Sequence, residues 1–145
     1  MNEIYITRQK ANLEHRNAAS LIKKAADMAL KAENMDGCVI SCMLTDDEGI
    51  REMNALWRGK DAVTDVLSFP MGDTDPESGK ILLGDMMINL SRCALQGEEL
   101  GHGFDREIMY LTVHSVLHLL GYDHEDEGEE KAKMRAREKE IMGDD

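Results

Sequence analysis

The sequence predicts a single α+β domain in which about five helices pack on a mixed four-stranded sheet. Its 145 residues suit one compact core. Strand-like runs are separated in some places by a helix and in others by a loop, which favours an α+β arrangement over a regular alternation. No repeat, low-complexity tract or Pro-rich linker divides residues 1–145. We therefore expect one domain, with the helix near 105–120 at its centre.

The first half of the chain predicts two strands and two helices. A strand is expected at 4–7, followed by a helix over about 14–32 whose apolar residues recur with the helical period. A second strand is expected at 38–44. The sequence Thr45-Asp46-Asp47-Glu48 is typical of a helix start, and Gly59 marks the end of that helix. The apolar positions of this helix are Ile50, Met53, Leu56 and Trp57.

The second half predicts two more strands and three helices. Strands are expected at 66–69 and 80–88, separated by a loop at about 71–80, and the near-continuous apolar character of 80–88 is typical of a buried strand. Helices follow near 89–100, with Asn89 as the cap, and at about 105–120. The second of these is apolar nearly all round, as buried helices are. A charged helix with an acidic start closes the chain.

Composition and charge exclude several classes of protein. A net charge of -12 argues against a general nucleic-acid coat, so any polyanion must be met locally. No apolar run approaches the roughly 20 residues that span a bilayer. The N-terminus has no signal-peptide pattern, so we expect a cytoplasmic protein without a membrane segment. The three cysteines are expected to be small core residues rather than disulfide partners or metal ligands: Cys38, Cys42 and Cys93.

Residues 114–124 read HSVLHLLGYDH and contain three of the five histidines. His114 and His118 are four residues apart, so they lie on one face of a helix. Gly121 allows a left-handed end to that helix, after which the chain can bring His124 back to the same point. Three imidazole nitrogens with a fourth tetrahedral position open to water predict a zinc site of the catalytic kind. The other two histidines, His15 and His102, lack such company and are expected at the surface.

The reaction at this site stays open on the residues alone. The spacing is also that of the metzincin proteases, which favours peptide hydrolysis, but those enzymes place a glutamate base where this chain has Ser115. A base would then have to come from the metal site itself or from elsewhere in the chain. A further alternative is a non-catalytic factor whose metal has a structural role.

Three stretches of the chain resemble the YbeY-type endoribonucleases, which are also described as ribosomal RNA maturation factors. HSVLHLLGYDH is similar to the family's signature, LWRGKDAVTDVLSFP at 56–70 to its arginine-containing segment, and LLGDMMI at 82–88 to one of its strand motifs. The resemblance implies an endoribonuclease specific for single strands, with one zinc ion per chain. It further implies a role in 16S rRNA 3′-end maturation and ribosome quality control. The implied partners are the ribosomal small subunit, a small-subunit ribosomal protein and an assembly GTPase.

The same resemblance places the family's catalytic arginine at Arg58. A guanidinium suits the negative charge that builds on a phosphoryl group in the transition state. Without the resemblance, a surface arginine at a helix C-terminus would be the simpler interpretation. His114 is expected to be both a ligand and part of the catalytic centre.

The remaining candidates surround this centre. Asp65 and Asp85 are expected to orient a ligand histidine, to bind Arg58, or to cap a turn, because an unpaired charge in or beside an apolar strand is costly. Asp123 adjoins the last ligand, so it is expected either to orient that ligand or to be a solvent-facing acid in a turn. The substrate cleft is expected to be lined by Ser68, Phe69 and Pro70, with Phe69 offering a face for base stacking.

Overall fold

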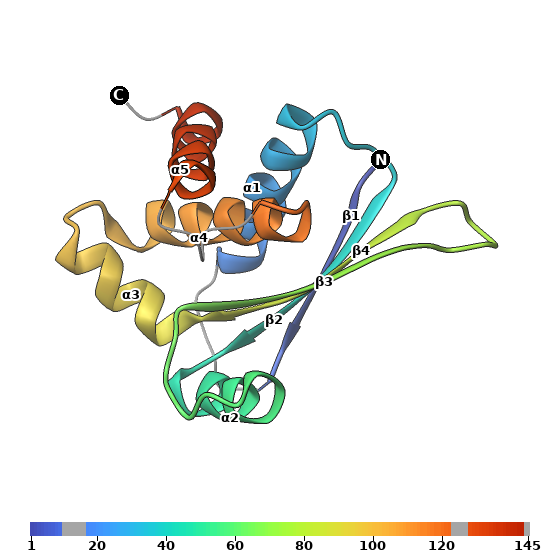
Figure 1. The fold of residues 1–145 in the computed structure, drawn as a ribbon. Helices are drawn as coiled ribbons and strands as arrows, with labels where there is room; N and C mark the ends of the chain where they lie inside the picture. The colour runs from blue at the N-terminus through green and yellow to red at the C-terminus, as the bar shows by residue number, and fades with distance from the viewer. Residues whose placement is uncertain (10–16, 123–127, 144–145) are drawn as a thin grey trace.

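The computed structural model describes residues 1–9, 17–122 and 128–143. Within them it has one sheet and five helices, as the sequence predicted (Figure 1). The elements in chain order are β1 (Glu3–Arg8), α1 (Ala18–Ala32), β2 (Cys38–Thr45), α2 (Asp47–Arg58), β3 (Val66–Thr74), β4 (Ile81–Asn89), α3 (Leu90–Glu99), α4 (Gly103–Leu119) and α5 (Glu129–Met142).

The sheet is mixed, with strand order β1-β2-β4-β3. β1, β2 and β4 run parallel, whereas β3 and β4 form an antiparallel hairpin. β1 and β3 are therefore the two edge strands. The position of β3 at an edge matters for the site, because one side of its backbone is not paired within the sheet.

The two faces of the sheet are covered unequally. α1, α4 and α5 lie on one side, and α2 lies alone on the other (Figure 1). α4 is the central helix: it contacts α1, α3, α5 and both strands of the hairpin. Its buried residues face several directions, which confirms the predicted buried helix. The largest side chains of the main core include Ile22, Leu30, Ile40, Leu44, Ile108 and Leu117.

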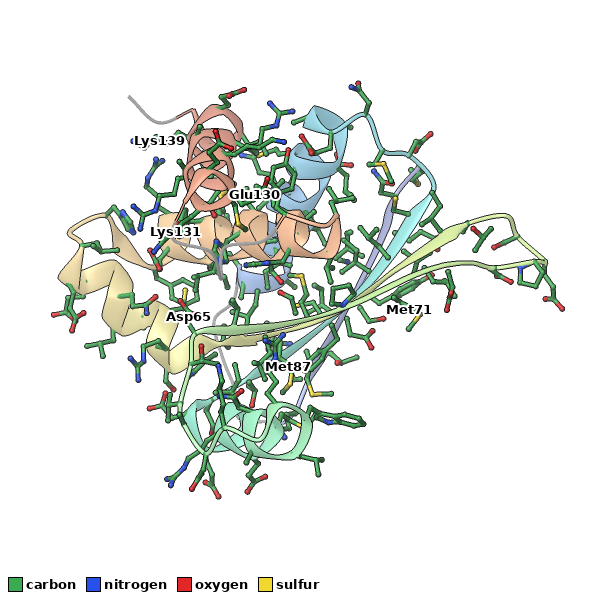
Figure 2. The ribbon with its side chains drawn as sticks, viewed as in Figure 1. Asp65, Met71, Met87, Glu130, Lys131 and Lys139 are labelled. Atoms are coloured by element: carbon green, nitrogen blue, oxygen red, sulfur yellow. The ribbon has the colours of Figure 1, made fainter. Side chains whose placement is uncertain are left out.

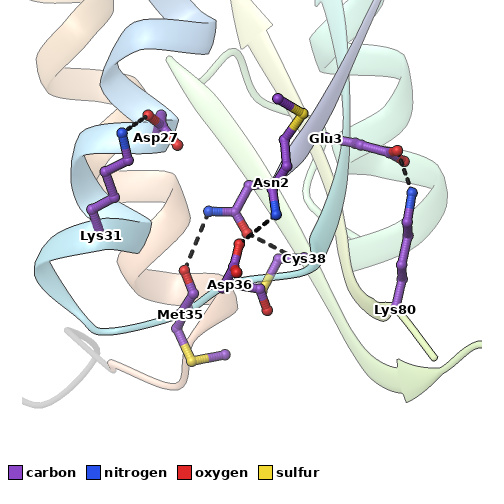
Figure 3. A network of polar contacts seen from close by, with 9 residues as sticks. Asn2, Glu3, Asp27, Lys31, Met35, Asp36, Cys38 and Lys80 are labelled. Carbon is purple, nitrogen blue, oxygen red and sulfur yellow. Dashed lines mark hydrogen bonds and ion pairs between the residues drawn. The ribbon is translucent and has the colours of Figure 1, made fainter.

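The N-terminal edge strand is held by polar contacts at its first residues (Figure 3). The Asn2 side-chain amide donates to the Met35 carbonyl, and its oxygen accepts from the Cys38 backbone N–H at 2.9 Å. The N-terminal ammonium lies 2.7 Å from an Asp36 carboxylate oxygen. These contacts join the residues just before β1 to the residues at the start of β2, and so help to hold the two strands side by side.

One loop was predicted where the structure has a strand. β3 continues through Thr74, so the predicted loop at 71–80 is wrong for residues 71–74. The register shifts between Pro70 and Asp73, and pairing with β4 then resumes. An edge strand tolerates a proline and a bulge, which break the alternation that identifies strands in a sequence. The resulting hairpin reaches well beyond the helices, with Met71 on its outer part (Figure 2).

α2 buries less of its apolar surface than its sequence suggested. Ile50 is buried and Met53 half-buried, but Leu56 and Trp57 are 72% and 63% exposed. Leu56 lies off the buried side of the helix. Trp57 lies beside a part of the sheet face that α2 does not cover, where it lines an apolar hollow with Met43. Here tertiary packing, rather than helical periodicity, decides which side chains are buried.

All three cysteines are buried and reduced, in agreement with the prediction that they are core residues. Burial raises the pKa of the Cys42 thiol to about 12. Burial, with a smaller contribution from the Glu107 carboxylate, raises that of Cys93 to about 12 as well. None of the described helices is long and apolar enough to cross a membrane.

Candidate active site

A cleft of about 380 Å³ lies between α4, β3 and the C-terminal end of α2. His114 and His118 reach it from α4, Ser68 from β3, and Arg58 from α2. The remaining lining residues are Asn54, Lys60, Thr64, Asp65, Val66, Leu67 and Pro70. Three distant segments thus bring the predicted arginine and two of the predicted ligand histidines into one cleft.

The two histidines are arranged as their spacing predicted. Their ring centroids are 4.8 Å apart and the rings are nearly perpendicular. α4 ends at Leu119, and Gly121 has a φ of +106°, a conformation that side-chain-bearing residues rarely adopt. Its backbone N–H donates to the His118 carbonyl at 3.0 Å. The chain therefore turns sharply directly after the histidine helix, as a returning ligand would require.

The third predicted ligand, His124, and the neighbouring Asp123 lie outside the described residues, as does His15. Within residues 1–9, 17–122 and 128–143, no three His, Cys, Asp or Glu side chains form a group that could hold a metal ion. The structure accordingly places two of the three predicted ligands. His102 lies in the exposed turn before α4, as expected, with its Nε2 2.7 Å from a Glu107 carboxylate oxygen.

A buried carboxylate that was not predicted from the sequence contacts Nδ1 of His114. Glu138 of α5 is 3% exposed, and its Oε2 lies 2.5 Å from His114 Nδ1. The Tyr110 hydroxyl donates to the other carboxylate oxygen at 3.1 Å. When a neutral imidazole donates from Nδ1, its lone pair is on Nε2, which is the usual arrangement behind a ligand histidine.

Tyr110 keeps its proton in this arrangement. Burial raises the pKa of the Tyr110 hydroxyl, and the Glu138 carboxylate beside it raises that pKa further. The hydroxyl therefore remains a hydrogen-bond donor at neutral pH. In the sequence, Glu138 is one acid among many in a polar helix, and no periodic signal distinguishes it from its solvent-exposed neighbours.

Arg58 is the last residue of α2 and is held at the β3 edge. Its Nη2 donates to the Ser68 carbonyl at 2.8 Å, and its guanidinium carbon lies 5.8 Å from the centre of the Phe69 ring. The carbonyl is available because β3 has a sheet partner on one side only. A guanidinium has five N–H donors, so this bond leaves donors for an anionic ligand in the cleft.

Ser115 faces the sheet and not the cleft. It is fully buried, and its Oγ lies 2.6 Å from the Oγ of Ser68. A residue at this position of α4 is therefore directed into the interface between the helix and β3. The residue at the position where metzincins carry their glutamate base is thus engaged with β3 and is not among the residues that line the cleft.

Two predicted site residues lie on the other face of the sheet. Asp85 and Phe69 are paired across β3 and β4, and both line the hollow on the α2 side. Strand alternation explains this, because Ser68 and Met86 face α4 while their neighbours face the opposite way. Met87 projects toward α2 in the same manner (Figure 2). The expectations that Asp85 orients a histidine and that Phe69 lines the histidine cleft are wrong.

Asp65 does line the cleft, at the start of β3. Its Oδ1 accepts hydrogen bonds from the Val66 backbone N–H at 2.8 Å and from the Thr64 hydroxyl. Its backbone carbonyl accepts from the Asn89 N–H. Of the roles considered for this residue, these contacts support the capping of a turn.

Comparison with known proteins identifies the family. A sequence model described as endoribonuclease YbeY matches residues 3–144. The chain belongs to the YbeY endoribonuclease family. Curated relatives with that name come from Aquifex aeolicus, at 45% identity over 83% of this chain and 79% of the relative, and from Clostridium botulinum, at 43% identity over 92% and 89%. Another comes from Persephonella marina, at 40% identity over 98% and 92%. The chain is accordingly an endoribonuclease, a hydrolase of phosphodiester bonds.

The fold has a counterpart among solved structures. The solution structure of TM1509 from Thermotoga maritima superposes with a TM-score of 0.62, covering 97% of this chain and 89% of that one. At 24% sequence identity, this likeness concerns the fold alone. It agrees with the single α+β domain seen here.

Proposed function

We propose that this endoribonuclease depends on one zinc ion and cuts single-stranded RNA in the cleft between α4 and β3. The observation that supports the proposal most is that Arg58 and the histidine pair line the same cleft although they come from opposite faces of the sheet. Membership of an endoribonuclease family supplies the reaction class. A cation placed where charge develops on the phosphoryl group stabilises the transition state of phosphodiester cleavage.

Two of the three proposed zinc ligands lie within the described residues, and their chemistry would suit the ion. His114 and His118 present imidazoles one helical turn apart, and a buried carboxylate holds Nδ1 of His114. His124 is the third proposed ligand. A bound zinc ion would supply Lewis acidity at the scissile phosphate. Three histidine nitrogens in tetrahedral geometry are one of the common ligand sets of catalytic zinc.

The chain's own residues have separate tasks. The Glu138 carboxylate fixes the ring of His114, so this ligand does not rotate away from the cleft. Arg58 would bind a nonbridging phosphate oxygen and stabilise the charge that develops during cleavage. Lys60, which also lines the cleft, would meet a neighbouring phosphate. Ser68 and Pro70 provide the wall along which the RNA strand would lie.

In the cell, we assign this activity to 16S rRNA 3′-end maturation and to ribosome quality control in the cytoplasm. The likeness to the family supports this assignment. The partners would be the small ribosomal subunit, one of its proteins and an assembly GTPase. A strongly acidic protein has little general affinity for RNA, so docking through partners would bring the substrate to the cleft.

Two alternatives make different predictions. A peptidase of the metzincin kind would need a base beside the first histidine to take a proton from the attacking water, and the buried Ser115 at that position weighs against it. A non-catalytic assembly factor with a structural metal would lose its fold, and not a reaction, when the metal is removed.

The test combines metal content with RNA cleavage. Elemental analysis should give about one zinc per chain, and a single-stranded RNA should be cut before chelation and not after it. Arg58→Ala should lower kcat by about 10²-fold or more and retain zinc. Arg51→Ala is the matched control, because Arg51 lies on the same helix but is exposed and paired with Asp61. Bound zinc without cleavage by the intact protein would contradict an enzyme that acts alone.

A further inference from the structure

The two halves of the cleft both border one strand, β3. The histidines belong to α4, Arg58 belongs to α2, and these helices cover opposite faces of the sheet (Figure 1). Both strands of the hairpin contact both helices, but of the two only β3 lines the cleft and bonds to Arg58. The position of Arg58 relative to the histidines is therefore set by how α4 and Arg58 are each attached to β3.

Both attachments meet at Ser68. Its backbone carbonyl accepts the hydrogen bond from Arg58 Nη2 at 2.8 Å. Its hydroxyl lies 2.6 Å from the hydroxyl of Ser115, the residue next to His114 on α4. One residue thus contacts the catalytic arginine through its main chain and the ligand helix through its side chain. We call the Ser68–Ser115 hydrogen bond the serine bridge.

We propose that the serine bridge sets the position of Arg58 relative to the ligand histidines, and that Ser115 is a positioning residue of the endoribonuclease. The inference rests on the proposed function of Arg58. It gives the buried Ser115 a structural role toward β3, and not the role of a catalytic base. It also explains a polar pair at this point, where two apolar residues would satisfy the packing equally well.

Burial and topology make the bridge effective. Ser115 is 0% and Ser68 8% exposed, so a Ser115 hydroxyl that loses this bond has no access to solvent. β3 pairs with β4 on one side only, which leaves α4 as its restraint on the face toward the histidines. Each serine has one side-chain torsion before its hydroxyl, so the bridge leaves little freedom between helix and strand.

The first test is Ser115→Ala in steady-state cleavage of a single-stranded RNA with zinc present. We expect kcat to fall between about tenfold and hundredfold, because small displacements of a catalytic group have effects of this size. KM and zinc content should stay the same, since Arg58 acts mainly on charge that develops in the transition state. Ser68→Ala should lower kcat to the same extent, and it serves as the second variant if Ser115→Ala does not fold.

A double-mutant cycle separates positioning from general destabilisation. In an Arg58→Ala background, Ser115→Ala should have no further effect on kcat, because its effect passes through Arg58. The matched control is Thr112→Val. Thr112 is also fully buried on α4, but its hydroxyl donates to Ile108 of the same helix at 2.7 Å. This variant loses a buried hydroxyl and should keep its kcat.

A measurement without catalysis completes the test. The ¹⁵N NMR signal of the Arg58 Nε–H, assigned by its absence in Arg58→Ala, should shift in Ser115→Ala and Ser68→Ala and stay in place in Thr112→Val. An unshifted signal, or additive effects in the double-mutant cycle, would overturn the serine bridge. If the wild-type protein with zinc cuts no RNA, cleavage by the isolated chain is contradicted, and the NMR shift alone decides the positioning.

Discussion

Replacing Glu138 tests how the buried carboxylate beside His114 contributes to the proposed zinc site. Glu138→Ala removes the 2.5 Å contact with His114 Nδ1 and leaves the Tyr110 hydroxyl without its described acceptor. Loss of a group that orients a ligand histidine typically lowers metal affinity by about 10- to 100-fold. That range corresponds to about 1.4 to 2.8 kcal/mol of binding free energy. Because Glu138 is 3% exposed, solvent screening does not reduce this effect.

Two milder variants separate the contribution of the Glu138 charge to zinc affinity from that of its contact with Tyr110. Glu138→Gln keeps an oxygen that accepts from Nδ1 but removes the charge, so we expect a loss near the lower end, about tenfold. Tyr110→Phe removes the second contact of the carboxylate and leaves the first, so it should lower zinc affinity by less than about threefold. Glu140→Gln is the control on the same helix, since Glu140 is exposed and pairs with Arg137.

Zinc affinity is best measured by competition with a chromophoric chelator at neutral pH, on protein whose folding has been checked by circular dichroism. The reasoning is refuted if Glu138→Ala and Glu138→Gln both bind zinc as tightly as the wild type while remaining folded. A loss of zinc affinity no larger than that of the control Glu140→Gln would also refute it.

Two further predictions concern stability and thiol chemistry. In Gly84→Ala the new Cβ would lie 2.4 Å from the Phe69 carbonyl oxygen at a φ of +148°, so urea denaturation should show a loss of about 3 kcal/mol. Gly37→Ala, where φ is +70° but nothing lies within 4 Å, should lose only about 1 kcal/mol. Cys42 and Cys93 should not react with a disulfide reagent at pH 8 in the folded protein, because burial raises each pKa to about 12. The unfolded thiols ionise near pH 9, so the free energy of unfolding should fall as pH rises from about 9 toward 12.

Most of the fold follows from local sequence signals. Asn89 accepts from the Ser91 and Arg92 N–H groups at the start of α3, as its sequence predicts. α2 begins within the predicted Thr45–Glu48 signature, but its cap is Asp46, which accepts from the Gly49 N–H, and not the Thr45 of a capping box. The end of β3 did not follow, because a bulge beside Pro70 interrupts the alternation. The burial of α2 did not follow either, because it depends on which part of a sheet face the helix covers.

The candidate site was predictable where its residues share a helix and less so where they meet through the tertiary fold. The spacing of His114 and His118 is a local property of α4, and the structure has it. Whether Asp85 and Phe69 face the histidines depends on strand register, which a sequence fixes only once the pairing is known. Glu138 comes from a separate helix with no periodic signal, so only the packing of α5 on α4 reveals it.

The geometry of the cleft also bears on how so acidic a chain could act on RNA. With a net charge of -12, long-range attraction to a polyanion is absent. At physiological ionic strength, charges more than about 8 Å apart are largely screened, so the groups that touch the phosphate decide the local interaction. Among the described lining residues these are Arg58 and Lys60, and the carboxylate present, Asp65, has one oxygen engaged by backbone and side-chain donors. Such a cleft favours a phosphate that has already been placed in it and captures RNA poorly from solution. Cleavage should therefore depend more on how the substrate is presented than on its affinity for the isolated chain.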